Sequence, residues 1–296
     1  MLLHLDSRDL INAFKGNPID TDELHSVLIE RNTKLIYSPE TIQEVVTPAD
    51  VKESQRRLET LSMLPHRYIR QQKEIIKREF IEAIREVKST KIFSGKSILP
   101  FVSTWQVVLG PGQIKIENQI DDRLVDINME LLRDNPDVFR NTQEQFDAYA
   151  PNFRFDRLHA LNFRSGTEGV FRDAIGGTLK IVGLHPSNPL TGATLVDELT
   201  EWMRERPSIC PSWRLLGETY SEFIVNVTDK GRLGDEPDFR HVSVTPYVDA
   251  ITLDATFRGY IRAACRRLAE LQEPVDYRSR IFDDLNQWLS TAVESM

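Results

Sequence analysis

The sequence predicts an α/β protein whose mostly parallel sheet is built from the two ends of the chain. Three apolar runs carry this prediction: Met1–Leu5, Lys34–Tyr37 and Val248–Leu253. Strands that are buried on both faces of a parallel sheet read as nearly continuous apolar runs. Because a helical pattern follows each run, we expect strands and helices to alternate, which favours parallel pairing over hairpins.

The first two strands lead into short helices. Ser7–Phe14 continues the first run as a helix. After the second run, Ser38 is a good helix cap and Pro39 suits the first helical position. Glu44 lies about a turn and a half into that helix, so we expect it to lean toward Asp6 at the end of the first strand.

The middle of the chain, residues 51–232, predicts a mostly helical insertion. From Tyr68 to Val87 apolar residues recur at three-, four- and seven-residue steps, which predicts one long helix with an apolar face. Thr178–Gly183 predicts a short strand within this region. Beyond the third apolar run, Ala255 begins another helical pattern.

Composition limits the class of protein. The chain has 296 residues, of which 40% are hydrophobic, and can bury a core as one large domain or two modest ones. No apolar run is long enough to span a bilayer, no signal peptide is evident, and two cysteines indicate neither a disulfide framework nor a zinc site. We therefore expect a cytoplasmic protein. Its net charge of -8 argues against nonspecific coating of nucleic acid, but not against a nuclease whose carboxylates bind cations.

Acidic residues stand where the predicted strands end. Asp6 closes the first run, Glu44 lies on the helix after the second, and Asp254 closes the third, with Asp238 upstream at a helix start. The carboxyl ends of strands are where open α/β sheets place their chemistry. This arrangement of Asp6-Ser7, Tyr37-Ser38-Pro39 with Glu44, Asp238 and Thr252-Leu253-Asp254 resembles the PIN-domain nucleases.

The resemblance implies a PIN-like three-layer α/β/α sandwich formed by residues 1–50 and 233–296, interrupted by the insertion at 51–232. It also implies a metal-dependent endoribonuclease that hydrolyses RNA, or single-stranded DNA, with Mg²⁺ or Mn²⁺. Asp6, Glu44, Asp238 and Asp254 match the four catalytic and metal-binding acids of the family, and Asp249 is an additional candidate ligand. A protein partner or a second copy of the chain is compatible with this expectation.

Other interpretations remain open. Asp6, Asp238 and Asp254 all precede predicted helices, where an aspartate is a favoured cap. A PIN-like protein that no longer cleaves and serves as a binding module, for example in a toxin-antitoxin or defence assembly, has the same sequence pattern. So does a different α/β hydrolase or phosphatase that uses aspartates, although no Gly-x-Ser-x-Gly elbow is present.

A basic helix face offers a candidate surface for nucleic acid. Residues 66–96 carry nine Lys and Arg against four Glu. Lys73, Lys77 and Arg85 are the predicted phosphate contacts, together with His241 near the acids. A solvated helix face with Glu–Arg neighbours explains the same pattern of charges, and a capping or packing role explains His241.

Overall fold

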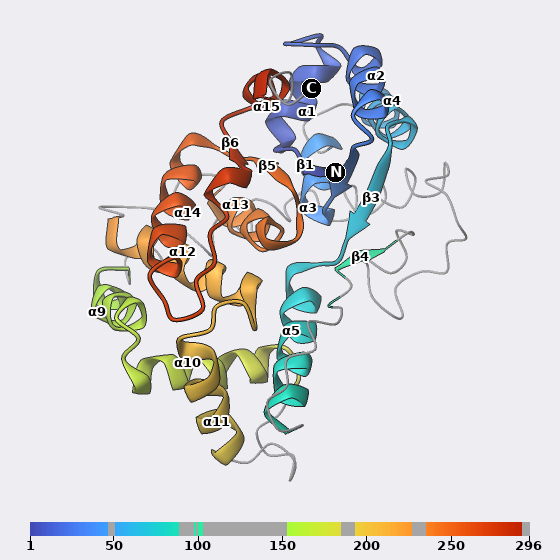
Figure 1. Cartoon of the computed structure of the whole chain (residues 1–296). Helices are drawn as coiled ribbons and strands as arrows, with labels where there is room; N and C mark the ends of the chain where they lie inside the picture. Colours follow the sequence, from blue (N-terminus) through green and yellow to red (C-terminus); the bar gives the residue numbers. More distant parts are fainter. Residues whose placement is uncertain are drawn as a thin grey trace.

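The computed structural model describes residues 1–46, 51–88, 98, 100–102, 153–184, 193–226 and 235–291 (Figure 1). The strands are β1 (Leu2–His4), β2 (Lys34–Tyr37), β3 (His66–Ile69), β4 (Phe101–Val102), β5 (Ala250–Thr252) and β6 (Ile281–Phe282). The α-helices are α1 (Ser7–Phe14), α2 (Thr21–Glu30), α3 (Pro39–Val46), α4 (Val51–Met63), α5 (Gln72–Lys88), α9 (Phe153–Arg164), α10 (Glu168–Ile181), α11 (Ala193–Arg204), α12 (Pro211–Asn226), α13 (Asp235–Val242), α14 (Ala255–Leu268) and α15 (Leu285–Thr291). Two 3₁₀ turns, η2 (Thr245–Tyr247) and η3 (Arg278–Arg280), precede β5 and β6.

The strands form one sheet in the order β4-β3-β2-β1-β5-β6. β1 lies at its centre, where Leu3 is opposite Leu35 of β2 on one side and Ala250 of β5 on the other. All neighbours pair in parallel except β4, which is antiparallel to β3 at the edge. The predicted α/β class with a mostly parallel sheet is confirmed, and the two ends of the chain lie side by side in it.

Helices cover both faces of the sheet, because successive strand residues point to opposite sides. In β2, Leu35 and Tyr37 belong to one hydrophobic core and Ile36 to the other. The first core is completed by α1, α2, α3, α4 and α15, and the second by α12, α13 and α14 with the start of α5. Each core is buried between the sheet and its own helical layer.

A third core holds the helical region together. α5 extends away from the sheet beyond β3 and packs with α10, α11 and α12 (Figure 1). Trp213 makes edge-to-face contacts with Phe80 and Phe171, and its ring centroid lies 5.5 Å from that of Phe80 and 5.3 Å from that of Phe171. The buried Glu79 of α5 accepts hydrogen bonds from the backbone N–H groups of Ser212 and Trp213 at 2.8 and 3.0 Å, which caps the start of α12.

Two predicted elements are wrong. His66–Ile69, expected to lie at or near the start of the long helix, forms β3, and the helix begins only at Gln72. Strands β3 and β4 thus belong to the same sheet although they lie within the range assigned to the insertion. Thr178–Gly183 is not a strand, because Phe171, Ile175 and Leu179 recur every four residues and form the buried face of α10.

Among the described residues, no helix is both long and apolar enough to cross a bilayer.

Candidate active site

An aspartate follows each of three adjacent parallel strands at the same edge of the sheet, called here the carboxyl edge. Asp6 comes after β1, Asp254 after β5 and Asp283 after β6. The backbone N–H of Asp6 donates to Oγ1 of Thr252 at 2.9 Å, which ties the end of β1 to the end of β5. Ligands of open parallel sheets bind at this edge.

Asp6 is both a helix cap and a buried acid. Its Oδ1 accepts the N–H of Arg8 at 2.8 Å at the start of α1. Burial raises the pKa of the Asp6 carboxyl, the nearby Glu44 adds to this rise, and the positive charge of His241 opposes it. The second oxygen has no hydrogen-bond partner among the described residues. The predicted cap is therefore present, and it leaves one oxygen of Asp6 able to bind a cation.

A chain of hydrogen bonds runs from β2 through two buried histidines to Glu44. His4 Nδ1 donates to the carbonyl of Ile36 at 2.9 Å, so its Nε2 accepts from His241 Nδ1 at 3.0 Å. His241 Nε2 then donates to Oε2 of Glu44 at 3.3 Å. With hydrogens on both ring nitrogens, His241 is an imidazolium and His4 is neutral.

The charges agree with this order of donors. Burial lowers the pKa of His241, but the hydrogen bond and charge of Glu44 outweigh it and raise the pKa to about 9. Burial and the neighbouring imidazolium lower the pKa of His4 to about 3. Burial would raise the pKa of Glu44, yet the net shift is downward because of His241, with a further hydrogen bond from Ser7. Glu44 is thus an ionised carboxylate within electrostatic range of Asp6.

Asp9 is a buried acid of the carboxyl edge that the sequence analysis missed. It is 4% exposed, and its Oδ2 has no hydrogen-bond partner among the described residues. Burial raises its pKa, against a hydrogen bond from the side chain of Thr252 and the charge of Arg8. Asp9 lies in the first turn of α1, where the helix dipole alone favours an acidic residue. Its position in the sequence therefore did not indicate a functional site.

Asp254 and Asp283 lie on the side of Asp6 away from Glu44. Asp254 caps α14 by accepting the N–H of Thr256 at 2.8 Å, and its other oxygen has no hydrogen-bond partner among the described residues. Asp283, also missed, is paired with Arg258 and Arg262, both at 3.3 Å. The two aspartates that follow β6 could have been found from the sequence, because the apolar pair Ile281-Phe282 is followed directly by Asp283-Asp284.

Three predicted site residues have different outcomes. Asp249 is exposed, precedes β5 and accepts the N–H of Leu2 at 2.8 Å, so it lies at the opposite edge of the sheet from Asp6 and does not join it. Asp238 lies in the fourth position of α13, after the helix has begun, and its side chain is outside the described residues. His241 is 2% exposed with both nitrogens engaged, which leaves no nitrogen for the predicted contact with a substrate.

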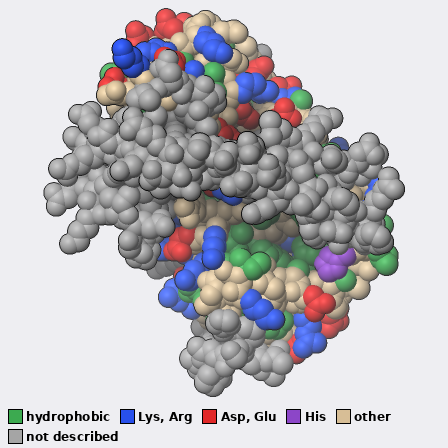
Figure 2. All heavy atoms as spheres, turned by 180° about the vertical axis from the view of Figure 1, so that it is seen from behind, with side chains coloured by type: hydrophobic (Ala, Val, Ile, Leu, Met, Phe, Trp, Pro, Cys, Tyr) green, Lys and Arg blue, Asp and Glu red, His purple; other side chains and the backbone are tan. Residues whose placement is uncertain are grey.

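The predicted basic face of α5 is partly neutralised. Arg85 pairs with Glu82, and Arg78 pairs with Glu74 at 2.9 Å. Lys73 and Lys77 have no ion pair among the described residues. On the face seen in Figure 2, described Lys and Arg side chains are interspersed with Asp and Glu and form no continuous basic surface.

The carboxyl edge suits a hard cation in its chemistry but is incomplete as it stands. Carboxylate oxygens are the ligands that Mg²⁺ and Mn²⁺ prefer, and Asp6 and Asp254 each keep one oxygen beyond the helix cap. Within the described part of the chain, however, no three His, Cys, Asp or Glu side chains are grouped so as to hold a metal ion. A complete ligand set needs a further group, for which the undescribed side chain of Asp238 is the predicted source.

The fold defines the class as an α/β protein with a mostly parallel sheet and an added helical region. No protein-family model, curated protein or solved structure matches the chain.

Proposed function

We propose that this protein is a PIN-like, metal-dependent endoribonuclease that hydrolyses phosphodiester bonds of RNA, or of single-stranded DNA, at the carboxyl edge. The observation that supports the proposal most strongly is that the Glu44 carboxylate, which accepts a hydrogen bond from His241, is close enough to Asp6 to add to the rise that burial causes in the pKa of Asp6. Asp6 follows β1 and Glu44 lies on the helix after β2, the parallel neighbour of β1. Asp254 follows β5, the neighbour of β1 on its other side, and caps α14. Helix capping accounts for Asp6 and Asp254, but not for an ionised Glu44 within electrostatic range of Asp6.

The proposed roles follow from the groups at this edge. Asp6, Glu44 and Asp254, with Asp238 as the fourth acid, are the proposed ligands of Mg²⁺ or Mn²⁺. Such an ion lowers the pKa of bound water and neutralises charge on the phosphate. His241 is a positioning residue, since it orients the Glu44 carboxylate and keeps it ionised.

Cleavage of a labelled single-stranded RNA and of the matching DNA tests the proposal. We expect cleavage that requires Mg²⁺ or Mn²⁺, stops with a chelator, and disappears in Asp6→Asn and in Asp254→Asn. Both substitutions keep a cap oxygen and remove a charge, so loss of activity without loss of folding isolates the metal role. Cleavage that persists in both variants would refute the assignment.

One observation favours the alternative of a binding module that does not cleave. The buried imidazolium of His241 already neutralises Glu44, as it would in a protein that never holds a metal. Calorimetric titration with Mn²⁺ separates the two functions. Binding of Mn²⁺ by the wild type that is lost in Asp6→Asn supports the nuclease. If the wild type binds RNA but does not bind Mn²⁺, the result supports the binding module.

A further inference from the structure

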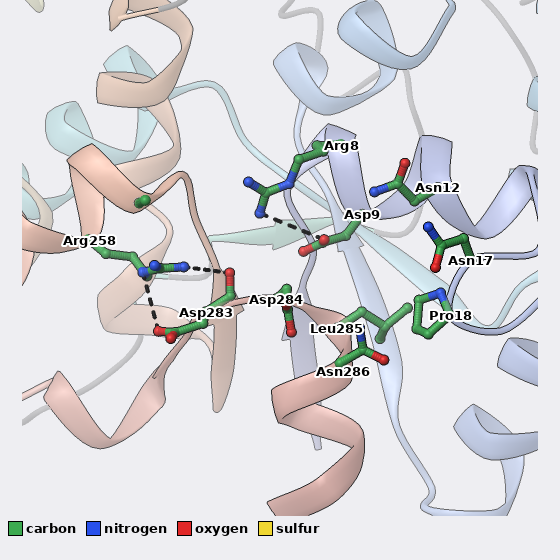
Figure 3. A pocket seen from close by; sticks show the side chains of 11 residues that line it. Arg8, Asp9, Asn12, Asn17, Pro18, Arg258, Asp283, Asp284, Leu285 and Asn286 are labelled. Atoms are coloured by element: carbon green, nitrogen blue, oxygen red, sulfur yellow. Dashed lines mark hydrogen bonds and ion pairs between the residues drawn. The ribbon is translucent and has the colours of Figure 1, made fainter.

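A cleft of about 440 Å³ lies at the carboxyl edge next to the proposed acids (Figure 3). Its walls come from α1, from the Asn17-Pro18 turn, from the start of α14 and from the segment 283–286 after β6. Arg8 lies two residues beyond Asp6, and Ala255 follows Asp254 directly. The cleft falls within the range of about 300–1,000 Å³ that small-molecule sites occupy. Whatever occupies it is therefore adjacent to the proposed reaction centre.

The two arginines of the cleft differ in how many of their donors are engaged. Arg258 donates to the carbonyl of Asp283 at 2.6 Å and pairs with the same residue's carboxylate, so it is fixed in place. The side chain of Arg8 is 45% exposed, and its nearest carboxylate oxygen, on Asp9, is 3.8 Å away, beyond hydrogen-bond distance. Arg8 thus has guanidinium donors available to an anion that enters the cleft.

Two acids provide acceptors opposite Arg8. The Asp9 carboxylate points into the space between Arg8 and Asp284 (Figure 3), and its buried Oδ2 has no hydrogen-bond partner among the described residues. Asp284 accepts the N–H of Gln287 with Oδ1 at 2.9 Å, and its other oxygen has no hydrogen-bond partner in the same part of the chain. An unpartnered buried oxygen costs about 1–3 kcal/mol, so a ligand that donates to it gains affinity.

These groups together select the chemistry of the ligand. A simple phosphate needs no acceptors, and a simple cation needs no arginine, so the lining suits a molecule with an anionic group and separate hydrogen-bond donors. Among the described residues, no aromatic side chain lines the cleft, which argues against stacking of a base. A ribonucleotide offers a phosphate and the 2′-hydroxyl donor that distinguishes RNA from DNA.

We propose that this cleft seats one ribonucleotide of the substrate strand, with Arg8 binding its phosphate and Asp9 and Asp284 accepting hydrogen bonds from its ribose hydroxyls. The inference rests on the proposed nuclease function and deepens it, because it names the group by which RNA is preferred over DNA.

Titration of the 296-residue chain with adenosine 5′-monophosphate (AMP), its 2′-deoxy analogue and inorganic phosphate tests the inference without metal. We expect AMP to bind about tenfold more tightly than the deoxy analogue, since a hydrogen bond to a charged group contributes about 1.5–3 kcal/mol. Arg8→Gln should weaken all three probes about tenfold for the same reason. Asp284→Asn keeps the cap oxygen and should weaken the binding of AMP, because it removes one of the two charged acceptors of the ribose hydroxyls.

Matched controls lie outside the cleft. Lys15→Gln removes an exposed positive charge at the end of α1, and Asp20→Asn alters the cap of α2, so both should bind the probes as the wild type does. Equal affinity for the two nucleotides, no binding of AMP, or no effect of Arg8→Gln would overturn the inference. Because these probes contain no internucleotide bond, failure of RNA cleavage with AMP binding intact would refute only the nuclease.

Discussion

The buried pair of His241 and Glu44 makes stability depend on pH in a defined window. The folded state raises the pKa of His241 from 6.5 to about 9. Because the folded chain binds this proton more tightly than the unfolded chain, the stabilisation is fully present below pH 6.5 and is lost as pH rises through about 9. The difference between the two pKa values corresponds to about 3 kcal/mol at 1.36 kcal/mol per pH unit.

The variant His241→Gln tests this magnitude, since glutamine can donate to Glu44 but does not titrate. Urea unfolding should show the variant to be about 3 kcal/mol less stable than the wild type near pH 6. The difference should fall to nearly zero by pH 10, and comparison of the two chains cancels the titration of groups that do not interact with His241. His25→Gln, at an exposed site, should differ little from the wild type at any pH. An equal difference for His241→Gln at pH 6 and pH 10 would refute the assignment of an imidazolium.

Three further variants test contacts that hold the fold. Glu79→Ala leaves two backbone N–H groups of α12 without an acceptor and should cost about 3 kcal/mol in urea unfolding, so a loss below about 1 kcal/mol would contradict the capping role. Gly217→Ala would place Cβ 2.7 Å from Cζ of Phe163 and should lower the melting temperature. Gly259→Ala places its methyl group in open space on a helix and should raise the melting temperature. Shifts of the same sign in the two variants would be inconsistent with this packing. Thr252→Val removes the acceptor of the Asp6 N–H and should cost about 1–3 kcal/mol, with Thr252→Ser restoring most of the loss; a neutral valine variant would show that this link is unimportant.

The parts of the fold that were predictable share a local signal. β1 and β5 are apolar runs that end on a capping aspartate. The strand, the start of the following helix and the position of the carboxyl edge could therefore all be predicted near Asp6 and Asp254. β3 was missed because its four residues merge with the helical spacing that begins at Gln72. Asp249 was named as a ligand from the resemblance alone, although it precedes β5 and therefore lies at the end of that strand opposite to Asp254.

Contacts between distant parts of the chain gave no such signal. His4 and His241 are 237 positions apart, and neither has a partner at a recognisable spacing. His4 reads as an interruption of an apolar strand, and only parallel pairing of β1 with β2 and β5 brings it between the Ile36 carbonyl and α13. The same holds for Asp9 and Thr252, which meet because β1 and β5 are neighbours.

The central claim is that acids at the carboxyl edge carry out metal-dependent cleavage, and that acids at the opposite edge of the sheet do not. Asp254→Asn and Asp249→Asn make the same change five residues apart at opposite ends of β5, so their RNA cleavage rates with Mn²⁺ test this claim most directly. The account predicts a loss of at least about 100-fold for Asp254→Asn and no loss for Asp249→Asn. Equal rates in the two variants, or the absence of cleavage by the wild type, would contradict it.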